Sequence, residues 1–325
     1  MKSINSNSKC TMTNPIVLIG TMGDSATPIP TERVYDNKTH AANYEVSTGG
    51  CTRDLARHII TLAGPIISGS VIHDNACGPG IVAQEIVGRD VLAQSPPDPN
   101  FNLTIRCTDR SEAMIDITKE GYSGCESANS MRESFPNVNV NMHVSPAERL
   151  PFPDNTFTHS FTNCGILHFE DSLAGAREIL RTLKPGATAV VTSWKDLKAF
   201  EVVRKAQRAC GHQEPLFRPP VDEKWFRAET MEDVLKDAGF RDVKVLTNTV
   251  HVAGKDVKDL CGHILMLMSR YREKWDGEQQ AAFEKQLHYA VEKVAVPIER
   301  SNAEGRGMEQ LIGIPMVALV GIARK

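Results

Sequence analysis

The sequence predicts an α/β protein whose centre is a doubly wound, mostly parallel sheet of seven strands, with helices before the first strand and a helical lid inserted before the last. Two observations carry this prediction. Short apolar segments alternate with helical patterns through the middle of the 325-residue chain, and 41% of the residues are hydrophobic while 24% are charged. The alternation favours a parallel sheet covered on both faces. The composition is typical of a globular protein with a sizeable core.

Strands are expected where short apolar runs are bounded by turn residues. In chain order they cover residues 70–74, 103–108, 138–143, 160–162, 188–194, 243–249 and 315–322. Helices are expected where apolar residues recur at spacings of three and four. These cover residues 44–62, 81–87, 111–122, 172–182, 200–210, 230–237 and much of 256–299.

Three regions follow from these patterns. Residues 1–34 form a polar N-terminal arm, residues 35–255 together with 306–325 form the main domain, and residues 256–305 form the helical lid. The lid would cover the carboxyl edge of the sheet, where ligands bind in open parallel sheets. Apolar faces on the N-terminal and inserted helices would also suit a homodimer.

Charge and hydropathy exclude several classes of partner. Lys and Arg total 37 against 40 Asp and Glu, so the net charge of −3 disfavours nucleic acid. The most apolar stretch, residues 312–323, is shorter than the roughly 20 residues of a membrane-spanning helix. The N-terminus lacks the apolar centre of a secretory signal, so a cytoplasmic location is expected. The eight cysteines are too widely spaced for a zinc site, and no metal is expected.

The first candidate site lies in residues 71–80, with the sequence VIHDNACGPG. It describes a strand that ends in Asp74 and a turn of small residues that opens a helix. Gly78 and Gly80 carry no Cβ, so the backbone of the turn can approach a ligand closely. The first amides of the helix are donors suited to a carboxylate or phosphate. Asp109 ends the next strand, where a carboxylate can accept hydrogen bonds from a ribose diol.

These first two motifs leave two classes of enzyme open. Gly78, Gly80 and Ala83 also fit the glycine fingerprint of nicotinamide-dinucleotide enzymes. In that fingerprint the ribose-binding acid follows after about 20 residues, whereas Asp109 lies about 30 residues further along. A nicotinamide-dependent oxidoreductase and a methyltransferase are both compatible with this spacing.

Two later stretches complete the pattern, AERLPFPDNTF at residues 147–157 and REILRTLKPG at residues 177–186. In this order the four motifs resemble the class I S-adenosylmethionine-dependent methyltransferases, most closely the ubiquinone and menaquinone biosynthesis branch. The resemblance covers residues 40–250 and the last strand. It implies a Rossmann-like fold, S-adenosylmethionine as cofactor, S-adenosylhomocysteine as product and a small-molecule substrate.

A narrower resemblance rests on three features: the Asn-Ala-Cys-Gly wording of the first turn, the pair Leu167-His168 and the long insertion. Together they are similar to fungal secondary-metabolite methyltransferases. Within that group, the enzymes that methylate alkaloids of the roquefortine, meleagrin and oxaline kind are a conceivable match.

The family resemblance implies a cofactor site at the carboxyl ends of the first four strands. It places Asp74, Asn75, Ala76, Gly78 and Gly80 around the methionine end, Asp109 and Arg110 at the ribose, Ala147 and Glu148 at adenine, and Asn163 and Cys164 beside the methyl group. Two positions depart from the family pattern. Pro146 stands where an acid usually precedes the alanine, and Thr158 stands where an acid usually follows Phe157. Glu148 or Ser145 would have to replace the first of these acids.

Candidates for contact with the methyl acceptor lie outside the four motifs. His168 follows the fourth strand, and because imidazole titrates near neutral pH it is the candidate general base or substrate anchor. The candidate acceptor-binding residues are Trp194, Trp225, His263, Met266 and His288. Packing in the core is the alternative role for the tryptophans and Met266, and a surface or core position is the alternative for the histidines.

The resulting hypothesis is methyl transfer to an oxygen or nitrogen of a small hydrophobic metabolite, aromatic or alkaloid in character. One alternative is an enzyme that binds S-adenosylmethionine but catalyses a cyclisation or rearrangement. The other is a regulatory module that engages a protein partner through the lid.

Overall fold

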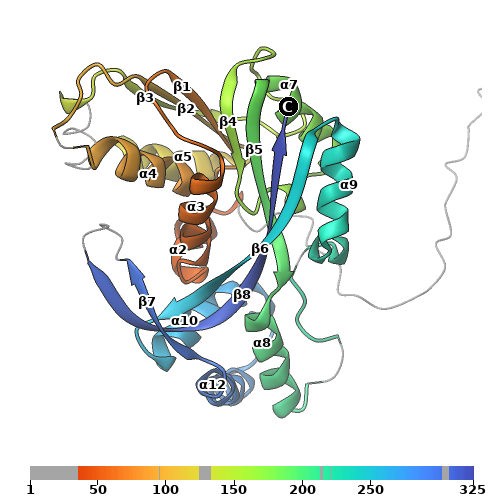
Figure 1. Cartoon of the computed structure of the whole chain (residues 1–325). Helices are drawn as coiled ribbons and strands as arrows, with labels where there is room; N and C mark the ends of the chain where they lie inside the picture. Colours follow the sequence, from red (N-terminus) through yellow and green to blue (C-terminus); the bar gives the residue numbers. More distant parts are fainter. Residues whose placement is uncertain (1–35, 95, 124–132, 213–214, 220, 302–306) are drawn as a thin grey trace, which may run out of the picture.

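The computed structural model describes residues 36–325 except 95, 124–132, 213–214, 220 and 302–306, so the predicted N-terminal arm, residues 1–34, lies outside the described residues. Its centre is one eight-stranded sheet in the order β3-β2-β1-β4-β5-β8-β6, with β7 paired to β8 (Figure 1). The strands are β1 (Ser70–Asn75), β2 (Leu103–Asp109), β3 (Val138–Val144), β4 (Phe157–Thr162), β5 (Leu183–Asp196), β6 (Arg241–Gly254), β7 (Val296–Ser301) and β8 (Met308–Arg324).

The helices fall between the strands as the alternating pattern predicts. The longer ones are α3 (Cys51–Leu62), α4 (Ile81–Ile86) with its continuation η2 (Val87–Leu92), α5 (Glu112–Ser123), α7 (Ser172–Thr182), α8 (Lys198–Ala209), α9 (Ala228–Ala238), α10 (Val257–Leu267) and α12 (Gly277–Glu292). The shorter ones are α1 (Lys38–Ala42), α2 (Tyr44–Ser47), η3 (Ile166–His168), η4 (Glu223–Phe226) and α11 (Ser269–Arg272).

Strands β3, β2, β1, β4 and β5 run parallel, and β8 is antiparallel to β5, β6 and β7. The predicted doubly wound, mostly parallel sheet is therefore confirmed. Strands β2 and β3 lie on one side of β1, whereas β4 and β5 lie on the other. The strand order therefore reverses between β1 and β4, and the carboxyl ends of these two strands are the usual ligand site in such sheets.

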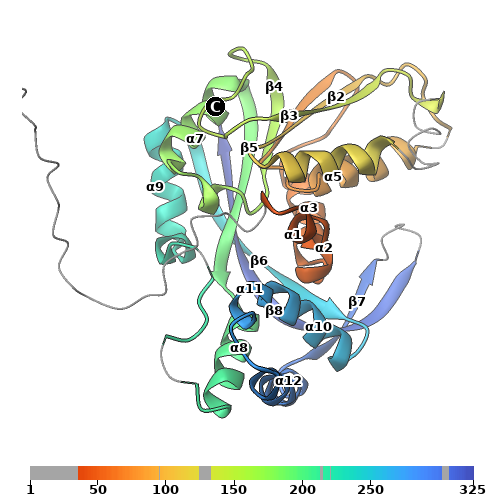
Figure 2. The same cartoon turned by 180° about the vertical axis from the view of Figure 1, so that it is seen from behind.

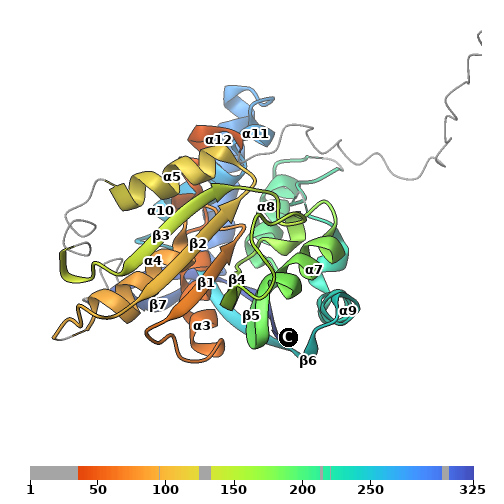
Figure 3. The ribbon, with the colours of Figure 1, turned by 90° about the horizontal axis from the view of Figure 1, so that it is seen from above.

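Each face of the sheet has its own core. On one face, α3, α4, α5 and α8 bury Leu55, Ile81, Ile115 and Val203 against the strands. On the other, α7 and α9 bury residues such as Ile179 and Leu235, and Figure 3 shows these two helices side by side. Burial on both faces explains the near-continuous apolar character of the central strands.

The antiparallel strands extend beyond the carboxyl ends of the parallel ones. Pairing of β5 with β8 stops at Asp196 and Val317, whereas β6 continues along β8 to Gly254 and Ile312. This extension, with β7, α8, α10 and α12, forms the lower part of the molecule in Figures 1 and 2. The insertion thus lies on the carboxyl-edge side of the sheet.

Three details of the predicted insertion and sheet are wrong. Residues 296–301 form β7 and not helix, so the sheet has eight strands; β8 begins at Met308 and not at residue 315; and β6 extends to Gly254. The extension of β6 has a tertiary cause, because His251 pairs with Pro315, which lies 64 positions further along the chain. Strand β7 pairs with the next strand in the chain, and Ile298 lies opposite Leu311. Local periodicity does not reveal such pairing.

The expected N-terminal helix over residues 44–62 is interrupted. Gly49 and Gly50 have φ of +53° and +72°, which separates α2 from α3. A Cβ on Gly49 would lie 2.7 Å from the Ala253 nitrogen, so the close approach of this turn to β6 requires glycine. Before it, α1 packs on α5 through Ala41, as Figure 2 shows for the two helices.

Two features are absent from the described residues. In that part of the chain no helix is long and apolar enough to cross a membrane. The same residues contain no group of three or more His, Cys, Asp or Glu side chains arranged to hold a metal ion.

Candidate functional site

The turn between β1 and α4 has the left-handed backbone that its small residues favour. Ala76, Gly78 and Gly80 have φ of +50°, +55° and +78°. A Cβ on Gly78 would point into open space, as expected for a position that a ligand approaches. A Cβ on Gly80 would lie 2.6 Å from Cγ2 of Thr118. Position 80 therefore requires glycine because the turn packs closely on α5, and not because a ligand approaches it.

Asp74 is a buried carboxyl beside this turn. It is 1% exposed, its Oδ2 accepts a hydrogen bond from the Ala83 amide at 3.1 Å, and its Oδ1 has no protein partner. Burial raises the pKa of Asp74 to about 8, against the lowering effect of the Ala83 amide and with a smaller raising effect of Asp109. One of the helix amides expected to bind a ligand is thus occupied by Asp74, while one carboxyl oxygen is left for a partner outside the protein.

Asp109 closes the other side of the turn. Its Oδ2 accepts from the Gly78 amide at 2.9 Å and its Oδ1 from the Ser111 amide at 2.8 Å. It does not cap α5, because the Ser111 hydroxyl accepts from the Met114 amide. Burial raises the pKa of Asp109, and the two amides lower it. Each oxygen makes one such hydrogen bond, and a carboxylate oxygen can accept two.

The loop after β3 is attached to the end of β2, because the Ser145 amide donates to the Asp109 carbonyl at 2.8 Å. The Ser145 hydroxyl is used within the loop, where it donates to the Arg149 carbonyl. Glu148 Oε1 accepts from the amides of Glu170 and Asp171. Neither Ser145 nor Glu148 therefore presents a simple replacement for the acid missing at Pro146.

Two further residues expected near the cofactor lie in this region. Ala147 is buried in the loop after β3. Arg110 is exposed and reaches Glu170 at 3.4 Å. The loop that carries η3 and the loop after β3 thus lie side by side at the end of β2.

The end of β4 is held by a second set of hydrogen bonds. Asn163 Nδ2 donates to the Thr52 carbonyl of α3 at 2.9 Å, and its Oδ1 accepts from the Thr192 hydroxyl at 3.1 Å. The Cys164 amide donates to the same hydroxyl at 2.7 Å, and Cys164 has φ +56°. Burial raises the pKa of the Cys164 thiol to about 12, so it is not a thiolate near neutral pH. The side chain of Asn163 therefore serves the protein, leaving its backbone to face a ligand.

Beneath the site, buried polar groups satisfy one another. Asn75 accepts from the Thr108 hydroxyl and donates to the Thr162 hydroxyl, both at 3.3 Å. His73 Nε2 lies 3.0 Å from Thr108, and burial lowers the pKa of His73 to about 3. Asn75 can accordingly reach a ligand through its backbone only.

The residues expected to contact the acceptor are not all brought together. His168 is exposed at the end of η3, and its amide donates to Gly165. Trp225 is 2% exposed in the core formed with α7 and α9, which favours its alternative, structural role. Trp194 is half-buried and touches both cores.

The candidates on the insertion are also separate from the turn. His263 and Met266 of α10 line a surface cavity of about 440 Å³ that is also lined by Val46 of α2. His263 is held there, because its Nδ1 donates to the Ala253 carbonyl at 2.9 Å. His288 lies on the exposed face of α12.

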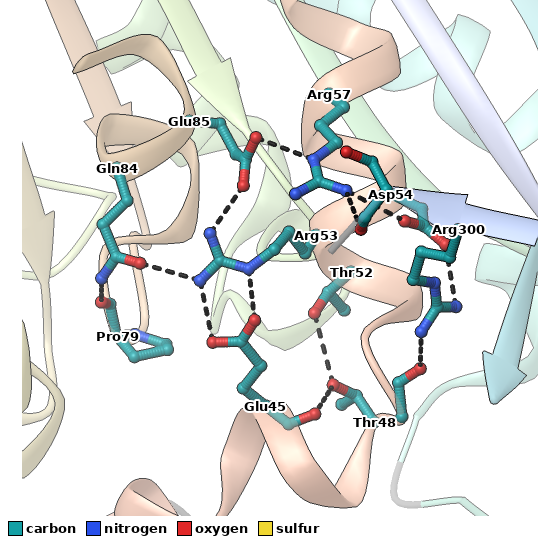
Figure 4. Close-up of polar contacts among 12 residues, drawn as sticks. Glu45, Thr48, Thr52, Arg53, Asp54, Arg57, Pro79, Gln84, Glu85 and Arg300 are labelled. Carbon is teal, nitrogen blue, oxygen red and sulfur yellow. Dashed lines mark hydrogen bonds and ion pairs between the residues drawn. The ribbon is translucent and has the colours of Figure 1, made fainter. Parts of the chain in front are cut away.

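Sequence reasoning missed a charged cluster beside the turn. Arg53 and Arg57 of α3 bind Glu85 of α4, and Arg53 also binds Glu45 of α2 (Figure 4). The two arginines are four residues apart and so share a helix face, which was the only local signal. Their shared partner Glu85 lies 32 positions from Arg53 and 28 positions from Arg57 in the chain.

Comparison with known proteins agrees with this arrangement. Residues 73–191 match the family described as a methyltransferase domain. Methyltransferase tpcH of Aspergillus fumigatus is 27% identical over 66% of this chain and 74% of its own length. The acetylaranotin bis-thiomethyltransferase of Aspergillus terreus is 24% identical over 80% of this chain and 87% of its own. A ubiquinone/menaquinone biosynthesis C-methyltransferase of Geobacter sulfurreducens is 33% identical, over 38% of this chain and 41% of its own.

Among solved structures, a Haemonchus contortus phosphoethanolamine N-methyltransferase with S-adenosylhomocysteine bound has a TM-score of 0.50 and 17% identity. The likeness covers 90% of this chain and 58% of that one, and it supports the fold. The glycine turn, the acid that ends β2 and the match of residues 73–191 to a methyltransferase domain together support a likeness of this chain to the class I S-adenosylmethionine-dependent methyltransferases. The relatives named above are two fungal enzymes and one bacterial enzyme of ubiquinone/menaquinone biosynthesis.

Proposed function

We propose that this protein transfers the methyl group of S-adenosylmethionine to an oxygen or nitrogen of a small hydrophobic metabolite. The observation that carries the proposal is the open space in front of Gly78, with the unpartnered Oδ1 of buried Asp74 and the carboxylate of Asp109 beside the same turn. An acidic, glycine-lined position at the end of β1 suits a ligand that carries an amino group and a ribose.

The residues present fit this cofactor. Asp74 and the backbone of Asn75, Ala76 and Gly78 would hold the methionine end, and the remaining acceptor positions of Asp109 would take the ribose hydroxyls. Ala147 would contact adenine, with Glu148 at the same end, and Arg110 would border the ribose. The backbone of Asn163 and Cys164 would lie beside the methyl group, and Gly80 would support the turn through its packing on Thr118.

The cofactor supplies an electrophilic methyl group, because its sulfur carries a positive charge. The task of the protein is then to align the acceptor and exclude water. Such positioning can lower a barrier by roughly 7 to 11 kcal/mol, whereas a general base typically contributes about 10² to 10⁴ in rate. His168 is the proposed base, because it is an exposed residue that follows β4 at the carboxyl edge of the sheet.

The acceptor class draws support from the relatives. One is named for bis-thiomethyl transfer in acetylaranotin formation, which makes a fungal secondary metabolite a reasonable acceptor and adds sulfur to the candidate nucleophiles. Within this acceptor class, we propose alkaloids of the roquefortine, meleagrin and oxaline kind as the narrower group. His263, Met266 and His288, on the carboxyl-edge side, and half-buried Trp194 are the proposed acceptor contacts, whereas the burial of Trp225 removes it from this group.

Calorimetric titration tests the proposed cofactor. S-adenosylhomocysteine is expected to bind with a micromolar Kd, and NADH, measured under the same conditions, is expected not to bind. Asp109→Asn should raise the Kd of S-adenosylhomocysteine at least about tenfold, because it removes charge-assisted hydrogen bonds. Mass analysis of turned-over phenols and alkaloids should then show addition of one methyl group. Binding of NADH alone would refute the proposal.

A further inference from the structure

A short relay of side chains joins helix α3 to the glycine turn (Figure 4). Arg53 Nη2 donates to Gln84 Oε1 at 2.8 Å, and Gln84 Nε2 donates to the Pro79 carbonyl at 2.9 Å. Pro79 is the residue between Gly78 and Gly80. Two consecutive hydrogen bonds therefore connect α3 to the middle of the turn.

The relay depends on the direction of the Gln84 amide. A primary amide has an accepting oxygen and a donating nitrogen, and rotation by half a turn exchanges them. A guanidinium group only donates, so Arg53 requires the oxygen of Gln84 on its side. The nitrogen then faces Pro79. In the reversed orientation the Gln84 oxygen would oppose the Pro79 carbonyl, and its amino group would oppose the guanidinium.

This contact matters because Pro79 has one backbone group that can form a hydrogen bond, and Gln84 binds it. Proline lacks an N–H, so its carbonyl is its only hydrogen-bonding group. Its neighbour Gly78 is held by two other residues, by Asp109 at its amide and by Thr118 of α5 at its carbonyl. Gln84 completes the support of the turn from the α4 side.

Arg53 is itself fixed in place. Its side chain is 14% exposed, it binds both carboxyl oxygens of Glu45 on α2, and its Nη1 donates to Glu85 Oε1 at 2.6 Å. The planar fork of donors lets one arginine serve all of these acceptors, which the single ammonium of lysine does not. Glu85 also accepts from Arg57 at 2.8 Å.

We propose that Arg53 is a positioning residue for the cofactor-binding turn, acting through the amide of Gln84. This inference rests on the proposed function, because it assumes that the Gly78 turn binds S-adenosylmethionine. It adds a role for a residue of α3, outside the strand–turn–helix motif itself.

The test compares two arginines of the same helix. Arg53→Met removes the relay, whereas Arg57→Met removes an ion pair to the same Glu85, and Figure 4 draws no contact between Arg57 and Gln84. The Kd of S-adenosylhomocysteine, measured by calorimetry, should rise about tenfold for Arg53→Met and stay within about twofold for Arg57→Met. Arg53→Lys keeps the positive charge beside Glu45 and Glu85, and it serves if Arg53→Met does not fold; a similar loss of affinity is expected because the fork is gone.

A double-mutant cycle with Gln84→Met shows whether Arg53 acts through Gln84. In the Gln84→Met protein, Arg53→Met is expected to raise the Kd of S-adenosylhomocysteine by less than twofold. In the wild type the same substitution is expected to raise this Kd about tenfold. Equal losses for Arg53→Met and Arg57→Met, or multiplicative losses in the cycle, would overturn the inference while the proposed function stands. Absence of binding to the wild type would instead overturn the proposed function and this inference with it.

Discussion

Asp74 and Asp109 show how burial and hydrogen bonding set the properties of single carboxyl groups. Both lie at the ends of neighbouring strands and both have a raised pKa because of burial. Asp109 uses both oxygens to hold backbone amides, whereas Asp74 leaves Oδ1 without a partner. Asp74 is therefore the residue whose charge should respond most to a bound cation.

The pKa of Asp74 makes stability depend on pH. The folded-state pKa of about 8 lies above the ordinary value of 3.8, so between these values the native state holds a proton that the unfolded state has lost. The contribution of Asp74 to the free energy of unfolding therefore falls as pH rises through this window, by up to about 1.4 kcal/mol per pH unit. Asp74→Asn should make the decline between pH 5 and pH 8 shallower in urea unfolding; parallel curves for the two proteins would contradict this.

The same group should couple cofactor binding to proton release. At pH 7 the Asp74 carboxyl is largely protonated, and an amino group placed beside it lowers its pKa and expels the proton. The calorimetric enthalpy of S-adenosylhomocysteine binding should then differ between phosphate and Tris, whose heats of protonation differ. Asp74→Asn should remove that difference. Identical enthalpies for the wild type in both buffers would show that Asp74 does not titrate on binding.

At the scale of the element, the β1–α4 turn combines two glycines with different roles. Gly78 faces open space, and Gly80 faces Thr118 of α5. The sequence shows both glycines but not this difference, because the neighbour of Gly80 comes from a helix 38 residues away in the chain. Only the packing of α5 on the turn distinguishes access for a ligand from close packing.

Alanine at the two positions should separate these roles. Gly80→Ala combines a left-handed backbone, at about 1 to 2 kcal/mol, with overpacking against Thr118, at about 1 to 3 kcal/mol, and should lower the free energy of unfolding by their sum. Gly78→Ala should lower the free energy of unfolding only by the backbone strain. It should weaken the binding of S-adenosylhomocysteine by more than this loss of stability implies. Urea unfolding and calorimetry of both variants measure this. A reversed order of stability would contradict the assignment.

For the whole molecule, Arg300 joins the inserted segment to the N-terminal helices. From β7 it donates to the carbonyls of Gly49 and His251, both at 2.6 Å, and it lies 2.8 Å from Asp54 of α3. Its side chain is 14% exposed. Arg300 therefore links three segments that border the carboxyl-edge side of the sheet.

Arg300→Met should destabilise the protein by about 3 kcal/mol, because it leaves Asp54 and two carbonyls without their largely buried partner. Arg218→Met is the matched control, since Arg218 is 69% exposed and pairs with an exposed Glu223, and it should change stability by less than about 0.5 kcal/mol. Chemical denaturation gives both values, and an equal effect of the two variants would contradict this role of Arg300.

The sequence alone predicted the parallel part of the sheet and the order of the strand, turn and terminal acid that make up the candidate site. Strand β1, its turn and the acid that ends β2 were predictable because strand periodicity, glycine and a terminal acid are local features. Helix α7 was likewise predicted at residues 172–182, since its apolar spacing is local, whereas the segment Lys184-Pro185-Gly186 that follows belongs to strand β5.

Tertiary structure decided what depends on distant partners. Strand β6 continues to Gly254 because β8 pairs with it, with Gly254 opposite Ile312, and Arg300 reaches Gly49 across 251 positions of the chain. The same holds for Arg53, whose contact with Gln84 spans 31 positions. A hydrogen bond between distant residues leaves no periodic trace in either segment, so the supports of the site became visible only when the chain was folded.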